Sequence, residues 1–158
     1  MVARSERSLQ RFGAGLAERN RRATLVAVDY QNPAEFLAAI DRAITRHGVP
    51  GVVLGWFHDS AAARALARHL SGRGQPVRFF HVLGSASADP AARLAEQREP
   101  YETLRGVQYH QIVLGFVVEG ERSRGLTHDE IASGVIEALA AERATRIVGT
   151  VEPWSARP

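Results

Sequence analysis

Polar side chains that could take part in chemistry stand at or near the ends of short apolar runs. His58 and Ser85 each follow such a run, and Tyr109 with His110 lies in a third. A tyrosine and a histidine could transfer protons, but a tyrosine near its reference pKa is a poor base at neutral pH without a neighbouring cation. The chain has no lysine, and nothing in the sequence places His110 or an arginine beside Tyr109. A packed, non-catalytic Tyr109 therefore remains the simpler interpretation.

The run 51–57 is apolar on both faces and precedes a helix-start signal, which is typical of a buried strand of a parallel sheet. Ligands of open α/β sheets bind at the carboxyl ends of such strands, so Trp56 and His58 could line a cleft there. An isolated histidine near an apolar strand is more often a packed, hydrogen-bonded residue. Asp59 is better explained as a helix cap than as a base.

Two further groups of candidates lie near the N-terminus. Arg4 and Ser5 stand where a helix begins, and arginines and helix N-termini both bind phosphate. A capped, solvated helix end explains the same pattern. Asp29 and Tyr30 end the apolar run 23–30, where the aspartate could recognise a ligand or bond backbone amides of a turn.

The order of elements predicts a three-layer, Rossmann-like α/β sandwich in a single domain, residues 1–158. Helices on both faces would cover a mainly parallel sheet of five strands. Pro100 is expected to interrupt the chain after a short helix, and residues 120–125 to form a loop. The strands are expected at 23–30, 51–57, 76–83, 111–118 and 146–151, and the helices at 5–20, 32–47, 60–70, 89–96 and 127–142.

Composition narrows the classes of function. The chain has 158 residues, 45% of them hydrophobic, and no cysteine, which excludes disulfides and thiolate metal sites. No apolar run is long enough to span a membrane, and the charged N-terminus lacks a signal-peptide core, so we expect a cytoplasmic protein. All 20 basic residues are arginines, scattered along the chain, which makes nucleic acid an unfavoured partner. The six histidines show no metal-ligand spacing, and we predict no metal.

The order of these signals resembles the short-chain dehydrogenase/reductase family, as found in a bacterial subgroup, over almost the whole chain. Two of the family's elements are not seen: the first strand with its Gly-rich phosphate turn, and the Tyr-x-x-x-Lys motif. The true start could lie upstream, or the chain could be a truncated relative. The similar segments are Val2 to Ser5, Val28 to Tyr30, Val53 to His58, His81 to Ser85, Tyr109 to Phe116 and Arg122 to Thr127.

The resemblance implies an oxidoreductase that binds NADP or NAD and moves a hydride between nicotinamide and a small carbonyl or alcohol. Ser85 would orient the substrate oxygen, and Tyr109 would be the proton donor. Asp29 would meet the adenine ring, and Arg4 slightly favours NADP by offering a partner to the 2′-phosphate. The cofactor-binding residues it implies are Arg4, Ser5, Asp29, Tyr30, Trp56 and His58.

A second interpretation is a non-catalytic Rossmann-like module that binds a nucleotide or a partner. The lysine-free sequence and the missing phosphate turn favour it. An unpaired strand edge at the place of the missing strand would favour pairing with a second copy of the chain.

Overall fold

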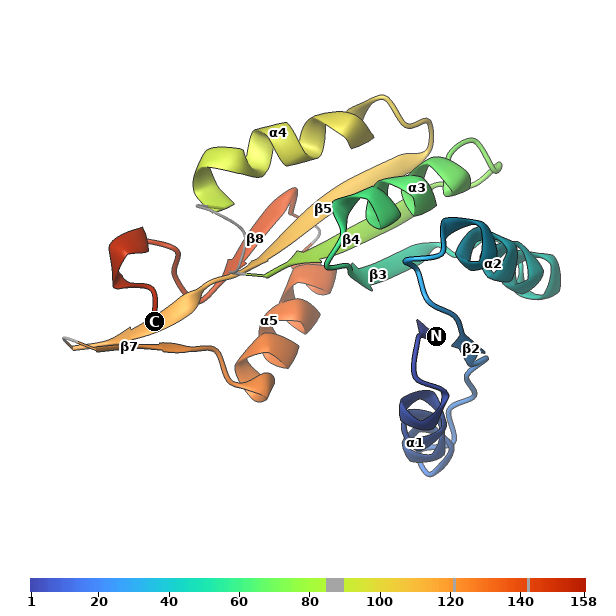
Figure 1. Ribbon diagram of the computed structural model, residues 1–158, viewed down its shortest axis with the longest axis horizontal. Coiled ribbons are helices and arrows are strands. Elements are labelled where there is room, and N and C mark those ends of the chain that lie inside the picture. The colour runs from blue at the N-terminus through green and yellow to red at the C-terminus, as the bar shows by residue number, and fades with distance from the viewer. Residues whose placement is uncertain (85–89, 121, 142) are drawn as a thin grey trace. The chain divides into compact units, whose positions relative to one another are not determined.

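The computed structural model describes residues 1–84, 90–120, 122–141 and 143–158. The chain divides into two compact units, Met1–Gly48 and Val49–Pro158. Strands of the first unit form a two-stranded parallel sheet, and strands of the second form a four-stranded parallel sheet and a hairpin (Figure 1). The chain is therefore an α/β protein.

The 1–48 unit contains two helices, and both begin at caps that the sequence predicts. The side chain of Ser5 accepts a hydrogen bond from Ser8 N at 3.2 Å, and that of Asn32 accepts one from Glu35 N at 3.4 Å. Each cap satisfies an amide that the first turn leaves unpaired. The elements are β1 (Val2–Ala3), α1 (Glu6–Ala17), β2 (Val26–Ala27) and α2 (Pro33–His47).

The prediction of a five-stranded sheet is wrong. The run 23–30 forms only the two-residue strand β2, which pairs in parallel with β1 through Val2 and Val26. The second pair of this ladder joins Ala3 and Ala27. The larger sheet has four parallel strands in the order β3-β4-β5-β8.

The 49–158 unit carries that sheet. Asp59 caps α3 by accepting a hydrogen bond from Ala61 N at 2.8 Å, as expected. Thr127 and Glu130 form the predicted capping box of α5, with bonds of 3.2 and 2.7 Å. The elements are β3 (Val52–Trp56), α3 (Ser60–Leu70), β4 (Val77–Leu83), α4 (Pro90–Glu102), β5 (Val107–Leu114), β6 (Phe116–Glu119), β7 (Arg122–Gly125), α5 (His128–Ala141), β8 (Thr145–Val148) and the 3₁₀ turn η1 (Trp154–Ala156).

Alternate residues of β4 and β5 serve the two faces of this sheet. Phe80 and Ile112 join a buried cluster with Ala138 of α5. On the opposite face, Phe79 and Tyr109 pack against Tyr101 of α4. Figure 1 accordingly shows α3 and α4 on one side of the sheet and α5 on the other.

Three local expectations in this unit also differ from the structure. Helix α4 runs through Pro100 to Glu102, although the proline has no N–H to donate to the carbonyl four residues earlier. Residues 122–125 form strand β7 of an antiparallel hairpin with β6 instead of a loop. The expected strand 111–118 is divided at Gly115 between β5 and β6.

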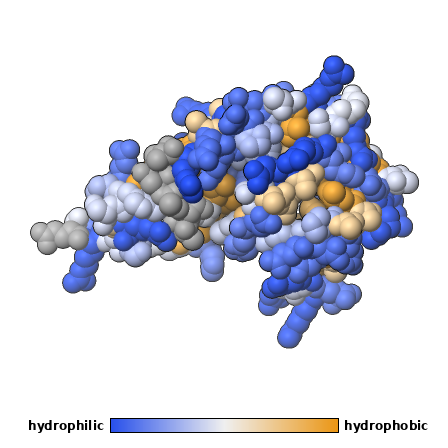
Figure 2. Space-filling model, turned by 45° about the horizontal axis from the view of Figure 1, so that its top comes forward, coloured by the Kyte–Doolittle hydropathy of each residue, from blue (hydrophilic) through white to orange (hydrophobic). Residues whose placement is uncertain are grey.

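The surface of the molecule is mostly polar on the face shown in Figure 2. Among the helices that the structure describes, none has both the length and the apolar character needed to cross a membrane.

Candidate functional site

A cavity of about 430 Å³ lies in the 49–158 unit, between helices α3 and α4 and against the face of the sheet that carries Tyr109. Residues that directly follow β3 and β4 form one end of it, so the cavity reaches the edge where parallel strands bind ligands. Its described lining comprises Phe57, His58, Ser60, Arg64, His81, Leu83, Gly84, Arg93, Glu96, Gln97, Pro100, Tyr101 and Tyr109.

The deepest polar groups are a histidine and two tyrosines. His81 of β4 and Tyr101 of α4 are each only 2% exposed, and Tyr109 of β5 is 8% exposed. Nδ1 of His81 lies 2.9 Å from the Tyr109 hydroxyl. The rings of Tyr101 and Tyr109 stack with centroids 3.7 Å apart, and Phe57 meets His81 edge-on at 5.9 Å. The three side chains thus form one packed polar group inside an aromatic shell.

Burial disfavours the charged forms of all three side chains. It lowers the pKa of His81 from 6.5 to about 4, because a buried imidazolium loses its hydration. Burial, reinforced by the neighbouring Tyr101, raises the pKa of Tyr109 far above its ordinary value. Burial also raises the pKa of Tyr101. At pH 7 the group can exchange hydrogen bonds with a ligand, but Tyr109 cannot act as a general base.

Two buried atoms on the lining residues have no hydrogen-bond partner, Nε2 of His81 and Oε1 of Gln97. Such atoms are costly unless a ligand or water satisfies them. The lining also carries Arg64 and Arg93 against a single carboxylate, Glu96, whose oxygen is 3.9 Å from Arg93 Nε. The cavity therefore combines neutral hydrogen-bonding groups with an excess of positive charge.

The structure brings two of the predicted site residues to this cavity, Tyr109 and His58. Trp56 is 51% exposed and is not among the described residues that line it. Ser85 lies outside the described residues. Tyr109 lies beside His81 and Tyr101, and the Cζ atom of Arg98 is 5.8 Å from the centre of its ring.

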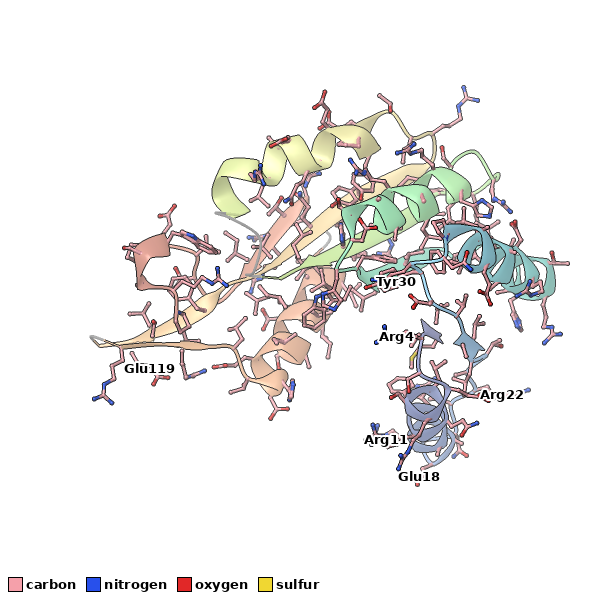
Figure 3. The ribbon with its side chains drawn as sticks, in the orientation of Figure 1. Arg4, Arg11, Glu18, Arg22, Tyr30 and Glu119 are labelled. Atoms are coloured by element: carbon pink, nitrogen blue, oxygen red, sulfur yellow. The ribbon has the colours of Figure 1, made fainter. Side chains whose placement is uncertain are left out.

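The predicted cofactor residues Arg4, Ser5, Asp29 and Tyr30 belong to the 1–48 unit, in which Figure 3 labels Arg4 and Tyr30. Ser5 caps α1, and Asp29 accepts a hydrogen bond from Gln31 N at 3.0 Å. The guanidinium of Arg4 lies 4.0 Å from the Asp29 carboxylate, with 77% of the Arg4 side chain exposed. Both interpretations of these residues, capping and ligand binding, are compatible with this geometry.

Sequence reasoning missed His81, Tyr101 and Gln97. His81 had a usable signal, because it alternates with Phe80 and Val82 in a buried run and so had to share a face with Phe79. Tyr101 was hidden by the expectation that Pro100 ends the helix. Gln97 sits in a helix of low amphipathic character, which gave no indication of its inward face.

The described residues contain no candidate metal site. Within residues 1–84, 90–120, 122–141 and 143–158, no group of three or more histidine and carboxylate side chains is placed to hold an ion.

No protein-family model, curated protein or solved structure matches this chain. The chemistry of the cavity and the topology of the sheet therefore carry the functional assignment.

The neutral His81 makes the stability of the protein depend on pH. In the unfolded chain the imidazole gains its proton near pH 6.5, but in the folded protein only near pH 4. The unfolded state binds more protons between these values, so the free energy of unfolding should fall by about 3 kcal/mol as the pH drops from 6.5 to 4. Urea unfolding at a series of pH values measures this slope.

Two variants separate His81 from other contributions to that slope. His81→Gln should remove most of the decrease between pH 6.5 and 4, since the titrating ring is gone. Val82→Ala, a buried neighbour on the opposite face of β4, should lower stability at every pH and keep the slope. An unchanged slope in His81→Gln would show that other groups produce it.

Proposed function

We propose that this chain is an NAD(P)-binding protein with a three-layer, Rossmann-like fold, similar to short-chain dehydrogenase/reductases. Its reaction would be hydride transfer between nicotinamide and a small carbonyl or alcohol. When bound, the cofactor supplies or accepts the hydride. The residues of this chain bind, orient and hydrogen-bond the reacting groups.

The position of the cavity is the observation that carries this proposal. Phe57 and His58 directly follow β3, and Gly84 directly follows β4, so the cavity opens at the carboxyl ends of two adjacent parallel strands. Dinucleotides bind at that edge in doubly wound sheets. The strand order β3-β4-β5-β8, and the parallel pairing of β1 with β2, are compatible with the same topology.

The chemistry of the lining is compatible with a nicotinamide group. The unpartnered Oε1 of Gln97 is an acceptor, and the amide of a nicotinamide carboxamide is a donor. The volume of about 430 Å³ lies in the range of pockets for small organic ligands, roughly 300–1,000 Å³. In the 1–48 unit, Arg4 would hold the 2′-phosphate and Asp29 would meet the adenine.

The reaction places different demands on the two proposed catalytic residues. Ser85 would orient the substrate oxygen. Tyr109, whose pKa burial holds far above its ordinary value, would donate a hydrogen bond toward that oxygen through the His81 and Tyr101 cluster. His58 and Trp56 would contact the cofactor at the end of β3.

The raised pKa of Tyr109 favours a second candidate, a non-catalytic nucleotide-binding module. A tyrosine that holds its proton this firmly is a weak acid, and it almost never forms the tyrosinate that would act as a base. The chain has no lysine, and the guanidinium of Arg98, 5.8 Å from the centre of the Tyr109 ring, lowers this pKa less than burial raises it. This module would bind the same cofactor without turnover.

Titration of the full chain with NADPH and NADH tests the proposal. We expect saturable binding at micromolar concentrations, followed by the fluorescence of Trp56 and Trp154. Arg4→Ala should lower the affinity for NADPH by roughly tenfold and leave the affinity for NADH nearly unchanged. The reason is that only NADPH carries the phosphate that the exposed guanidinium would contact.

Arg11→Ala is the matched control, since it removes an exposed arginine of the same unit (Figure 3). It should leave both affinities within about twofold. No binding of either nucleotide would exclude both the oxidoreductase and the nucleotide-binding module. Equal losses in Arg4→Ala and Arg11→Ala would exclude the specific role of Arg4.

A further inference from the structure

We propose that the cavity between α3 and α4 selects an aromatic oxo or hydroxy carboxylate, bound with its carboxylate at Arg64 and its oxygen at His81. The inference rests on the proposed function, because it names the substrate class for the same site. It follows from the positive charge of Arg64 and Arg93 in the cavity lining, from the unpartnered Nε2 atom of His81 and from the aromatic side chains of the lining.

The positive charge of the lining comes from two different helices. Arg64 projects from α3 and Arg93 from α4, while Glu96 is the only carboxylate among the described lining residues. Arg93 is partly compensated by Glu96 at 3.9 Å, with both side chains more than half exposed. Arg64 is less exposed, and its charge acts on Tyr101 inside the cavity. Arg64 is thus the stronger partner for an anion.

The second recognition point is His81. Its Nδ1 is engaged with the Tyr109 hydroxyl at 2.9 Å, and its Nε2 is buried without a partner. When the tyrosine donates to Nδ1, the ring proton resides on Nε2 and can be donated to a ketone or hydroxyl oxygen. The neutral state of the ring keeps this donor available without a second buried charge.

The body of the ligand follows from the remaining lining. Phe57, Tyr101 and Tyr109 present aromatic surface, and Leu83 and Pro100 add apolar surface. A flat apolar group attached beside the two polar points would bury against these side chains. An aromatic oxo acid offers a carboxylate, a ketone oxygen and such a ring in one small molecule.

Benzoylformate is the probe for this inference, and its methyl ester is the neutral counterpart with the same ring and ketone. We expect saturable binding of benzoylformate to the full chain, with a shift of the His81 imidazole signals in NMR spectra of histidine-labelled protein. The methyl ester should bind at least roughly tenfold more weakly, because its carboxylate charge is removed.

Substitution of Arg64 and Arg93, the two arginines of the cavity lining, tests the recognition of the carboxylate directly. Arg64→Gln should lower the affinity for benzoylformate by roughly tenfold. Arg93→Gln should lower this affinity by a smaller factor, and it is the second variant if Arg64→Gln does not fold. Arg122→Gln makes the same charge change on strand β7, away from the cavity lining, and should leave the affinity unchanged.

The outcomes separate this inference from the proposed function. No saturable binding up to about 10 mM benzoylformate, or equal affinities for acid and ester, overturns the inference. If NADPH still binds in that case, the proposed cofactor function stands alone. If the chain binds benzoylformate in a way that depends on Arg64 but binds neither nucleotide, the carboxylate site is supported and the oxidoreductase function is excluded.

Discussion

Gly115→Ala is expected to lower the free energy of unfolding of the 49–158 unit by about 4 kcal/mol. Gly115 lies between β5 and β6, where the chain passes from the parallel sheet into the hairpin. A Cβ atom there would overlap the carbonyl oxygen of Thr150 and come within 2.7 Å of its carbonyl carbon and 3.2 Å of Val148 O. Both neighbours are backbone, which cannot turn aside as a side chain can.

The overlap would act on a hydrogen-bonded junction. Phe116 and Thr150 exchange two backbone bonds of 2.9 and 2.8 Å, and Gly115 N donates to Val148 O at 2.9 Å. Moving Thr150 to admit the methyl group would stretch all three bonds, and Phe116 is fully buried beside them. The destabilisation therefore adds lost hydrogen bonds to steric strain.

Urea unfolding followed by tryptophan fluorescence measures this effect, because Trp56 and Trp154 both belong to the 49–158 unit. Gly51→Ala is the matched control, since a Cβ at Gly51 meets nothing within 4 Å. It should change stability by no more than about 0.5 kcal/mol. Similar unfolding midpoints for the two variants would contradict the packing described at Gly115.

Arg98→Ala is expected to cost about 4 kcal/mol of stability. Its guanidinium donates to the carbonyl oxygen of Tyr109 at 3.1 Å, to Gln111 Oε1 at 3.2 Å and to Thr145 Oγ1 at 3.1 Å, and also to the carbonyl oxygen of Ala144. One side chain thus ties α4 to β5 and to the start of β8. Removing it breaks four hydrogen bonds in a part-buried position, although Gln111 Oε1 still accepts from Thr145 Oγ1 and the Ala144 carbonyl oxygen from Gln111 N.

Two comparisons identify the source of that loss by urea unfolding. Arg93→Ala removes an arginine from the same helix, where a 3.9 Å ion pair between exposed groups should be worth at most about 0.5 kcal/mol. Arg98→Met keeps most of the apolar stem and should lose nearly as much as Arg98→Ala, since the hydrogen bonds dominate. A loss in Arg98→Ala no larger than that in Arg93→Ala would mean that the network contributes little.

The sequence by itself determined the helix starts. Ser5, Asn32, Asp59 and Thr127 all cap helices as predicted. Each cap joins residues at most three positions apart, so the chain near the cap contains all the information required. The α/β class followed in the same way from alternating apolar runs and helical patterns.

Pairing between distant segments was decided only by the tertiary structure. The run 23–30 contains enough β-branched residues for a full strand, but only Val26 and Ala27 pair, with Val2 and Ala3 of β1. The chain at 122–125 is polar and arginine-bearing, and its strand exists because β6 pairs with it. The need for a glycine at position 115 comes from contact with the backbone of Thr150, which is 35 residues away in the chain.

The candidate site shows the same division. His58 and Tyr109 could be identified because they stand at or within apolar runs, where periodicity indicates a strand. Their neighbours could not be, since the contact of His81 with Tyr109 spans 28 residues and depends on the register in which β4 pairs with β5. Local propensity sets where an element begins and which side chains share a face. The packing of helix on sheet decides which of those side chains meet and how burial shifts their pKa values, downward for His81 and upward for Tyr109.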